Sequence, residues 1–249
     1  MRVLVLGNSD TRGDFAAGET WPAVVAAALS AGKGRECLLR EVPFSAIAPG
    51  APEYAVRKVT EFDADLVILP LGTFAFSVGF AWVRVRRLFG KRVAERFRRA
   101  EEAFDTRTRP AGRVPGRFNT FTRRAIRRLL GTQPLTSRAA LGESYRTLLQ
   151  ALARAEGIHV LVVAYPPEQG KLVKLPDLGE QRKAFLAEVA AAARRHHFFL
   201  LDTAPLFQAR PAEPLITPDG FHLQAGGHRL VGEAVARAIE AAEAATQPS

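Results

Sequence analysis

Short apolar runs alternate along the chain with longer stretches in which apolar residues recur every three or four positions. The short runs are rich in Val, Ile and Leu, which is typical of parallel strands that are buried on both faces. We expect five strands, over Arg2–Leu6, Cys37–Val42, Asp65–Leu71, Ile158–Ala164 and Phe198–Asp202. The longer stretches predict helices over Thr20–Ala31, Pro52–Glu61, Glu143–Glu156, Leu178–Arg195 and Gln224–Ala242. Because strands and helices alternate, the pattern predicts an α/β fold with a parallel sheet of about five strands.

The alternation is interrupted between Ala81 and Leu130. This segment has 16 Lys and Arg against 4 Asp and Glu, a net charge of +12, which leaves 19 basic and 21 acidic residues outside it. The formal charge of +10 of the whole chain therefore belongs to one segment. Apolar side chains recur in its first half at helical spacing, at Trp82, Val85, Phe89, Val93 and Phe97.

This pattern predicts a basic amphipathic helix. A loop rich in Pro, Gly and Arg follows, and a second apolar face runs from Phe118 to Leu129. We expect a basic helical hairpin at 81–130, inserted into a single domain of residues 1–242, with a frayed tail at 243–249.

Size and composition narrow the class of protein. A chain of 249 residues that is 47% hydrophobic can bury a core of its own. Cys37 is the single cysteine, so no intramolecular disulfide forms and a reducing compartment is expected. We expect no secretory signal, because the apolar run at the N-terminus ends at a polar turn, and no apolar run is long enough for a transmembrane helix. The predicted location is the cytoplasm.

Candidate chemistry begins where the first predicted strand ends. Gly7, Asn8, Ser9 and Asp10 follow it, and ligands of open α/β sheets bind beyond the carboxyl ends of the strands. The stretch has neither the Gly-x-Gly-x-x-Gly pattern nor the Gly-Lys-Ser/Thr ending of nucleotide-binding loops. It is not the Gly-x-Ser-x-Gly elbow either, because Thr11 replaces the second glycine. Taken alone, Ser9 fits a turn or helix cap as well as a nucleophile.

A second polar cluster precedes the last predicted helix, in the stretch "TPDGFHLQAGGHRL". Asp219 and His222 lie three residues apart, so one loop can carry an imidazole and the carboxylate that orients it. A serine hydroxyl needs such a base to become a nucleophile. Alone, His222 is also compatible with a capping or partly buried histidine.

Together, the two ends resemble the SGNH, or GDSL-type, hydrolases, a family of serine esterases, lipases and deacylases with a flavodoxin-like α/β/α sandwich. "VLVLGNS" matches the block of a strand followed by Gly-Asp-Ser, with Asn8 in place of Asp, and "DGFHLQAGGHRL" matches the Asp-x-x-His block. The resemblance implies that Ser9 is the nucleophile, His222 the base and Asp219 its orienting carboxylate.

The resemblance also implies an oxyanion hole and a substrate site. The hole is expected from the backbone N–H groups of Ser9 and Gly50, and Asn8, Gly72 and Thr73 are expected to line the substrate site. No cofactor and no metal site are expected, and the histidines at 159, 196, 197 and 228 are given structural roles.

One family block is incomplete. Where the family has Gly-x-Asn-Asp, this chain has "LGTFAF", so Gly72 is kept while Phe74 and Ala75 replace the Asn and Asp. Thr73, or Asn119 in the insertion, is a candidate replacement donor. Three functions remain open: hydrolysis of an ester, acyl transfer to an alcohol or sugar with the same triad, and a weak or inactive relative that binds an anionic partner.

The basic insertion has four interpretations. It is a solvated hairpin whose Trp82, Phe89, Phe97 and Phe121 pack on the core, or a lid for an acidic or lipid-like acyl substrate. It also fits adsorption to an anionic membrane surface. Nucleic acid ranks last, because no known nucleic-acid motif accompanies the arginines. The expected ligand is a small-molecule or lipid-like ester.

Overall fold

The computed structural model describes residues 1–7, 11, 19–33, 36–107, 133–167, 177–217, 220 and 222–246. These residues form two compact units. The first unit contains the described residues of 1–73 and 138–246, and the second contains those of 74–137.

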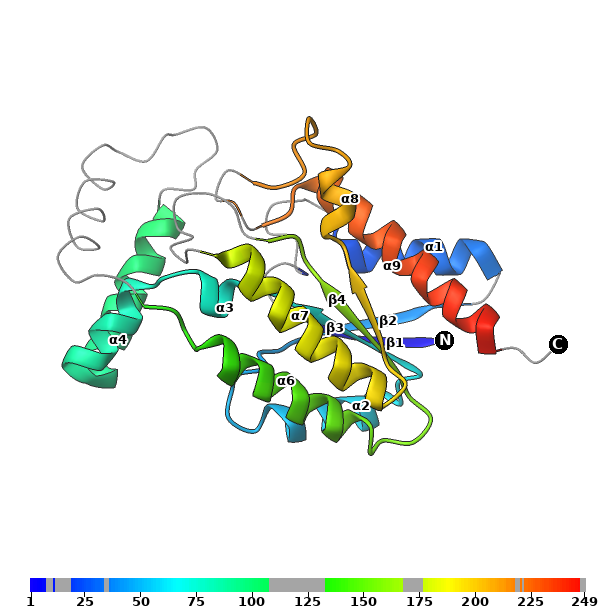
Figure 1. Cartoon of the computed structure of the whole chain (residues 1–249), viewed down its shortest axis with the longest axis horizontal. Helices are drawn as coiled ribbons and strands as arrows, with labels where there is room; N and C mark the ends of the chain where they lie inside the picture. Colours follow the sequence, from blue (N-terminus) through cyan, green and yellow to red (C-terminus); the bar gives the residue numbers. More distant parts are fainter. Residues whose placement is uncertain are drawn as a thin grey trace. The chain divides into compact units, whose positions relative to one another are not determined.

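The first unit is built on a parallel sheet of five strands (Figure 1). The strands are β1 (Arg2–Gly7), β2 (Leu38–Pro43), β3 (Leu66–Leu71), β4 (His159–Ala164) and β5 (Phe199–Asp202). Their order is β2-β1-β3-β4-β5, and every neighbouring pair is parallel. The predicted α/β fold is thus confirmed, and each strand boundary lies within one residue of its expected place. The order reverses between β1 and β3, which is the point where ligands bind in such sheets.

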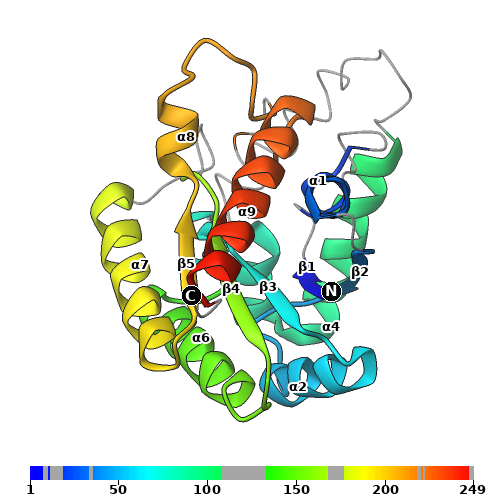
Figure 2. The same ribbon diagram turned by 90° about the vertical axis from the view of Figure 1, so that its right-hand side faces the viewer.

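Helices cover both faces of this sheet (Figures 1 and 2). The five long helices are α1 (Trp21–Lys33), α2 (Ala51–Phe62), α6 (Arg138–Leu152), α7 (Leu178–Arg195) and α9 (Ala225–Thr246). Helix α1 packs on α9, whereas α6 packs between α2 and α7. Alternate residues of a strand face the helices on opposite sides of the sheet. Val3, Ile68 and Val163 lie in the core with α1 and α9. Their neighbours Leu4 and Leu69 are equally buried.

A glycine allows α1 and α9 to pack closely. A Cβ at Gly232 of α9 would lie 2.6 Å from the Val24 Cβ and 2.9 Å from the Trp21 carbonyl oxygen of α1. Only hydrogen fits there. The contact fixes α9 over the sheet, and with it the loop that leads into α9.

The helices depart from expectation at their ends. Helix α6 begins at Arg138 instead of Glu143, and α9 continues to Thr246, so 243–246 of the expected tail are helical. Residues 247–249 lie outside the described part. Gly142 lies inside α6, where the absence of a side chain admits the Glu188 carboxylate of α7. The short helices α3 (Phe74–Ser77) and α8 (Ala204–Gln208) were not predicted.

The second unit contains α3 and the long basic helix α4 (Ala81–Arg107). Phe80 and Gln133 exchange two backbone hydrogen bonds, of 2.7 and 3.2 Å, and tie the two ends of the described part together. Helix α4 bends at Gly90, whose φ of 82° and ψ of 173° belong to a region open essentially to glycine.

The bend corrects the expected apolar face of the insertion. Val85 is buried at 3% exposure, but Phe89 is 59% exposed and Val93 48%. Val85 and Phe89 both precede Gly90, whereas Val93 follows it, so the change of helix axis at Gly90 separates Val93 from the earlier apolar positions. The expectation that Phe89 packs on the core is therefore wrong. Phe121, the Phe97 side chain and the second helical face at 118–129 lie outside the described residues, so the hairpin remains a prediction.

Within the described part of the chain, no helix combines the length and the apolar character that crossing a membrane requires.

Candidate active site

The carboxyl ends of β1 and β3 frame the candidate site. β1 ends at Gly7, where a Cβ would lie 2.2 Å from Thr11 Oγ1 and 2.8 Å from Glu41 Oε1. The fully buried Thr11 donates its hydroxyl hydrogen to Glu41 Oε1 on β2. The chain thus returns onto the end of its own strand only four residues later, and glycine is required at position 7.

Several predicted site residues lie outside the described part. Asn8, Ser9, Asp219 and the alternative donor Asn119 belong to this group. The nearest described residues are Gly7 and Thr11 on either side of Asn8 and Ser9, and Thr217 and Gly220 on either side of Asp219. The triad as a constellation therefore stays a prediction.

The loop that carries His222 is closed by hydrogen bonds. The Thr217 backbone N–H and side-chain hydroxyl both donate to the His222 carbonyl oxygen, at 2.8 and 3.2 Å. The Gly220 N–H donates to the Thr217 carbonyl at 2.9 Å, and the Gln224 side chain donates to the Ile216 carbonyl at 3.0 Å. These bonds hold a half-buried His222 just before α9 begins.

Behind His222 lies a buried polar network between α9, α1 and β4. The Trp21 backbone N–H donates to His228 Nδ1 at 3.2 Å, and the Trp21 indole N–H donates to the Tyr165 hydroxyl at 2.8 Å. Burial, and then the charge of nearby His222, lower the pKa of His228 to about 4. His228 is therefore neutral at physiological pH and serves as a hydrogen-bond acceptor.

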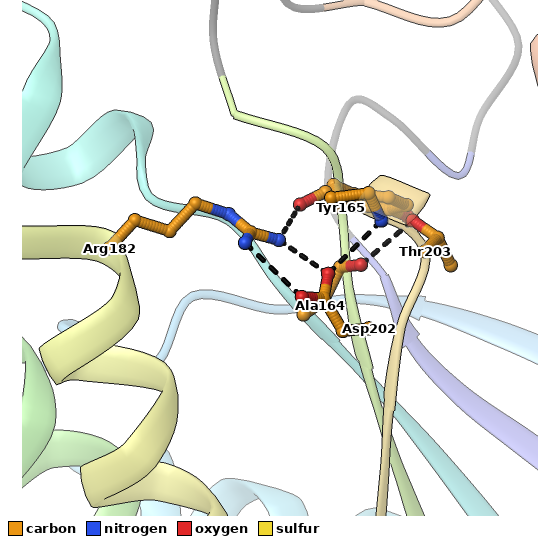
Figure 3. A network of polar contacts seen from close by, with 6 residues as sticks. Ala164, Tyr165, Arg182, Asp202 and Thr203 are labelled. Carbon is orange, nitrogen blue, oxygen red and sulfur yellow. Dashed lines mark hydrogen bonds and ion pairs between the residues drawn. The ribbon is translucent and has the colours of Figure 1, made fainter. Parts of the chain in front are cut away.

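A second network fixes the carboxyl ends of β4 and β5 (Figure 3). Arg182 of α7 donates to both carboxylate oxygens of Asp202, at 2.6 and 3.3 Å, and to the Tyr165 carbonyl at 2.8 Å. Asp202 also accepts from the Ala204 N–H at 3.1 Å, and the Thr203 hydroxyl donates to the Ala164 carbonyl at 2.8 Å. The guanidinium thus joins α7 to both strands at the same end of the sheet as Gly7.

The remaining predicted residues are placed as follows. Gly50 has a left-handed backbone, with φ at 71°, and is the N-cap of α2. Gly72 and Thr73 directly follow β3, with Thr73 buried at 4% exposure. Ala75, which replaces a polar family residue, is buried within α3 and offers only a methyl group.

Two further features bear on the chemistry. Among the described residues, no group of three His, Cys, Asp or Glu is placed to hold a metal ion.

A cavity of about 720 Å³ opens at the end of the sheet opposite to the carboxyl ends of the strands. It is lined by Met1, Cys37, Asp65, His159 and Phe199 among others. Of the predicted site residues that the structure describes, Gly50, Gly72, Thr73 and His222, none lines it.

Sequence reasoning missed the supporting polar contacts. Thr11 and Glu41 are 30 positions apart, Trp21 and Tyr165 are 144 apart, and Trp21 and His228 are 207 apart. No local sequence pattern predicts a contact between residues so far apart in the chain. The only signal in the sequence was that polar residues lie at strand ends, as Asp202 does at the end of β5.

The comparisons with known proteins agree with this geometry. The model of the GDSL-like lipase/acylhydrolase family matches residues 5–230. No curated protein matches the chain. Solved structures of similar fold include TesA, with 15% identity, a TM-score of 0.56 and coverage of 97% of this chain and 99% of that one.

Two acetyl xylan esterases also share the fold. AlAXEase is 15% identical, with a TM-score of 0.57 and coverage of 96% and 100%. A catalytic mutant of Axe2 from Geobacillus stearothermophilus is 13% identical, with a TM-score of 0.58 and coverage of 96% and 93%. At these identities, the likeness shows the fold.

Proposed function

We propose, since the chain belongs to the GDSL-like lipase/acylhydrolase family, that it hydrolyses carboxylic esters through an acyl-enzyme formed on Ser9. Membership makes the protein a hydrolase of the acylhydrolase class. The nucleophile and the ester substrate are our inference. The observation that supports it is the described frame at the carboxyl ends of β1 and β3, with Gly7 and Gly72, and the hydrogen-bonded loop that carries His222 into α9.

The covalent chain limits where Ser9 can be. It lies two residues beyond Gly7, so its Cα is within about 7.6 Å of the Gly7 Cα. Thr11, two residues further on, is back in contact with Gly7 and bonded to Glu41. The chain connectivity therefore keeps Ser9 within reach of the carboxyl end of β1, where ligands of such sheets bind, and this supports its assignment as the nucleophile.

We assign the general base to His222. Its backbone is fixed by two bonds from Thr217, and its imidazole is half-buried, so it is accessible from solvent. His228, the buried neighbour, is already engaged with the Trp21 N–H and has a low pKa, which makes it a poor proton acceptor for a serine. Asp219, three residues before His222, is assigned to orient the imidazole and stabilise its charged form.

We assign the oxyanion hole to the backbone N–H groups of Ser9 and Gly50. Gly50 lies at the N-terminus of α2, where the helix dipole favours negative charge. Within the described part of the chain, the Gly50 N–H has no hydrogen-bond acceptor. Asn8, Gly72 and Thr73 are assigned to the substrate site, because each directly follows β1 or β3.

The proposed reaction has two steps. His222 takes the Ser9 proton as Oγ attacks the ester carbonyl, and the protonated imidazole then gives that proton to the departing alcohol. In the second step His222 takes a proton from water, the hydroxide attacks the acyl carbon, and Ser9 Oγ leaves with the proton. The acid is released and the serine is regenerated.

One observation favours a second candidate function. Phe74 and Ala75 replace the polar pair of the family, and Ala75 is buried in α3. Loss of one oxyanion donor costs about 3 kcal/mol, or a hundredfold in rate. A weak or inactive relative that uses the same crevice for binding is therefore the alternative.

A fluorophosphonate probe separates the two candidates. We expect intact-mass analysis to show one adduct on the wild-type protein and none on Ser9→Ala or His222→Ala. Ser77→Ala is the matched control, because it removes the same hydroxyl group at a buried position, only 2% exposed, and should leave the adduct unchanged. A folded wild-type protein without adduct would establish the inactive alternative, and an adduct that persists in Ser9→Ala would remove Ser9 as the nucleophile.

A further inference from the structure

The stretch 86–93 of α4, "RRLFGKRV", is exposed at every position. Arg86, Arg87, Lys91 and Arg92 give it four cations and it contains no acidic residue. Within the described part of the chain, no carboxylate forms an ion pair with any of the four. We name residues 86–93 the α4 bend surface, after the bend at Gly90.

The same stretch exposes large apolar side chains. Leu88 is 51% exposed, Phe89 59% and Val93 48%. The only other large hydrophobic residues exposed to this degree among those described are Leu38 and Phe199, which stand singly on the first unit. Isolated exposed apolar residues are ordinary, but a cluster rimmed by charge marks an interaction surface.

We propose that the α4 bend surface binds the headgroup region of an anionic lipid bilayer. Cations interleaved with Leu and Phe are what interfacial helices use: the apolar side chains enter the boundary between headgroups and acyl chains, while Lys and Arg stay at the anionic phosphates. Each cation close to such a surface contributes about a fivefold gain in binding. The four unpaired cations thus supply the attraction, and Leu88, Phe89 and Val93 supply the insertion.

Two other occupants fit less well. A second copy of the chain would bring two clusters of four cations together without an acidic partner, so repulsion opposes pairing through this surface. A nucleic acid would use the cations. It would gain nothing from the aliphatic Leu88 and Val93, whose exposure would stay unexplained. Only a lipid surface uses both chemistries.

This interaction does not depend on the proposed hydrolysis. The surface is built from α4 alone, and binding requires neither Ser9 nor His222. Ser9→Ala should therefore bind vesicles as the wild-type protein does. An inactive protein that binds lipid, or an active one that does not, would distinguish the two proposals.

The first arm of the test is co-sedimentation of the full chain with vesicles at near-physiological ionic strength. We expect binding to vesicles of phosphatidylcholine mixed with phosphatidylglycerol and far weaker binding to pure phosphatidylcholine. Arg86→Gln with Arg92→Gln should weaken binding about 25-fold, from about fivefold for each charge. The control is Arg194→Gln with Arg195→Gln, two exposed cations of α7 whose loss changes the net charge equally and should have little effect.

The second arm tests insertion. Leu88→Ser with Phe89→Ser should weaken binding about tenfold, from the apolar area that no longer leaves water. Phe199→Ser, a similarly exposed apolar side chain on β5, is the control. In a Trp82→Phe background, a Trp placed by Phe89→Trp should be quenched by lipids brominated on their acyl chains. Trp21 is fully buried and gives a constant background.

Four results would overturn the proposal. One is equal binding to neutral and anionic vesicles, and another is equal weakening by the α7 control. A third is anionic binding that survives Leu88→Ser with Phe89→Ser and is displaced by an RNA duplex, which would show a polyanion site. The last is a dimer by light scattering that dissociates in the same variant, which would show that a second copy covers the surface.

Discussion

Gly7 occupies a position with no room for a side chain. In Gly7→Ala, the Cβ would meet Thr11 Oγ1 at 2.2 Å and Glu41 Oε1 at 2.8 Å, and Thr11 is fully buried, so the turn after β1 must move. We expect a loss of about 1–3 kcal/mol in the free energy of unfolding, typical of overpacking. If Ser9 acts from this turn, kcat/KM for an ester should fall at least about tenfold, since catalysis depends on sub-ångström placement of the nucleophile. Urea unfolding and hydrolysis of an activated ester measure both effects.

Gly179→Ala is the matched control for this substitution. Gly179 lies in α7, and a Cβ there would meet nothing within 4 Å. Because Ala is favoured over Gly in a helix by about 1 kcal/mol, stability should stay constant or rise. Activity should not change. Equal losses in the two variants would mean that the close contact at Gly7 is not what makes glycine necessary.

At the scale of residues, a contiguous motif can be recognised in the sequence, whereas a contact between distant residues cannot. His222 and Asp219 were singled out because they share one short stretch before a helix, and their pairing stays a prediction. The acceptor role of His228 for Trp21 could not be foreseen, because the partners are 207 positions apart and only folding brings them together.

Among the elements, α7 is joined to the sheet by one guanidinium. Arg182 is 8% exposed as a residue and binds Asp202 and the Tyr165 carbonyl. Arg182→Met should lower the free energy of unfolding by about 2–3 kcal/mol, because the Asp202 carboxylate loses its cation and keeps only the Ala204 N–H, while the Tyr165 carbonyl loses the guanidinium donor. We place the loss below that of a fully buried pair, since the Asp202 side chain keeps 34% exposure to water. Urea unfolding measures it.

The Arg138–Glu188 pair, which joins α6 to α7, offers the control. Its side chains are 34% and 39% exposed, and their contact is 2.8 Å. An exposed pair of this kind contributes about 0–1 kcal/mol, so Arg138→Met should change stability little. A difference of less than about 0.5 kcal/mol between the two variants would refute a special role for Arg182.

Strands were predictable as elements, but short and bent helices were not. Each strand is a continuous apolar run with polar ends, so its limits are visible in the sequence. By contrast, α3 and α8 are 4 and 5 residues long, too short to show a period. In α4 the period is present, yet Phe89 is exposed and the helix axis changes directly after it, at Gly90.

Across the whole molecule, the sequence indicated a parallel sheet but not the order of its strands. Alternating strands and helices are compatible with more than one doubly wound order. The family resemblance implied a flavodoxin-like sandwich, and the observed order β2-β1-β3-β4-β5 is the one such folds have. What the order adds is a reason for the site's position, since β1 and β3 become neighbours and their carboxyl ends meet.

The buried His228 makes the stability of the whole fold depend on pH. Its pKa is about 4 in the folded protein and 6.5 when unperturbed, so between these values the unfolded chain binds a proton that the folded chain does not. Above pH 6.5 this group does not lower the free energy of unfolding. As the pH falls from 6.5 towards 4, the free energy of unfolding decreases by about 3 kcal/mol at most. In His228→Asn the amide oxygen still accepts from the Trp21 N–H, but no group titrates. We expect the free energy of unfolding, measured in urea from about pH 7 to about pH 4.5, to fall less steeply in this variant than in the wild-type protein.

His159→Asn provides the control for that titration. It makes the same replacement of histidine by asparagine at an exposed position, at the start of β4. The comparison concerns slopes, because a buried Asn can lower stability equally at every pH without affecting the argument. Parallel curves for the wild-type protein and His228→Asn would show that His228 does not stay neutral in the fold. Its pKa would then be the same in the folded and the unfolded chain, and a lowered pKa of His228 would no longer be a reason to prefer His222 as the base.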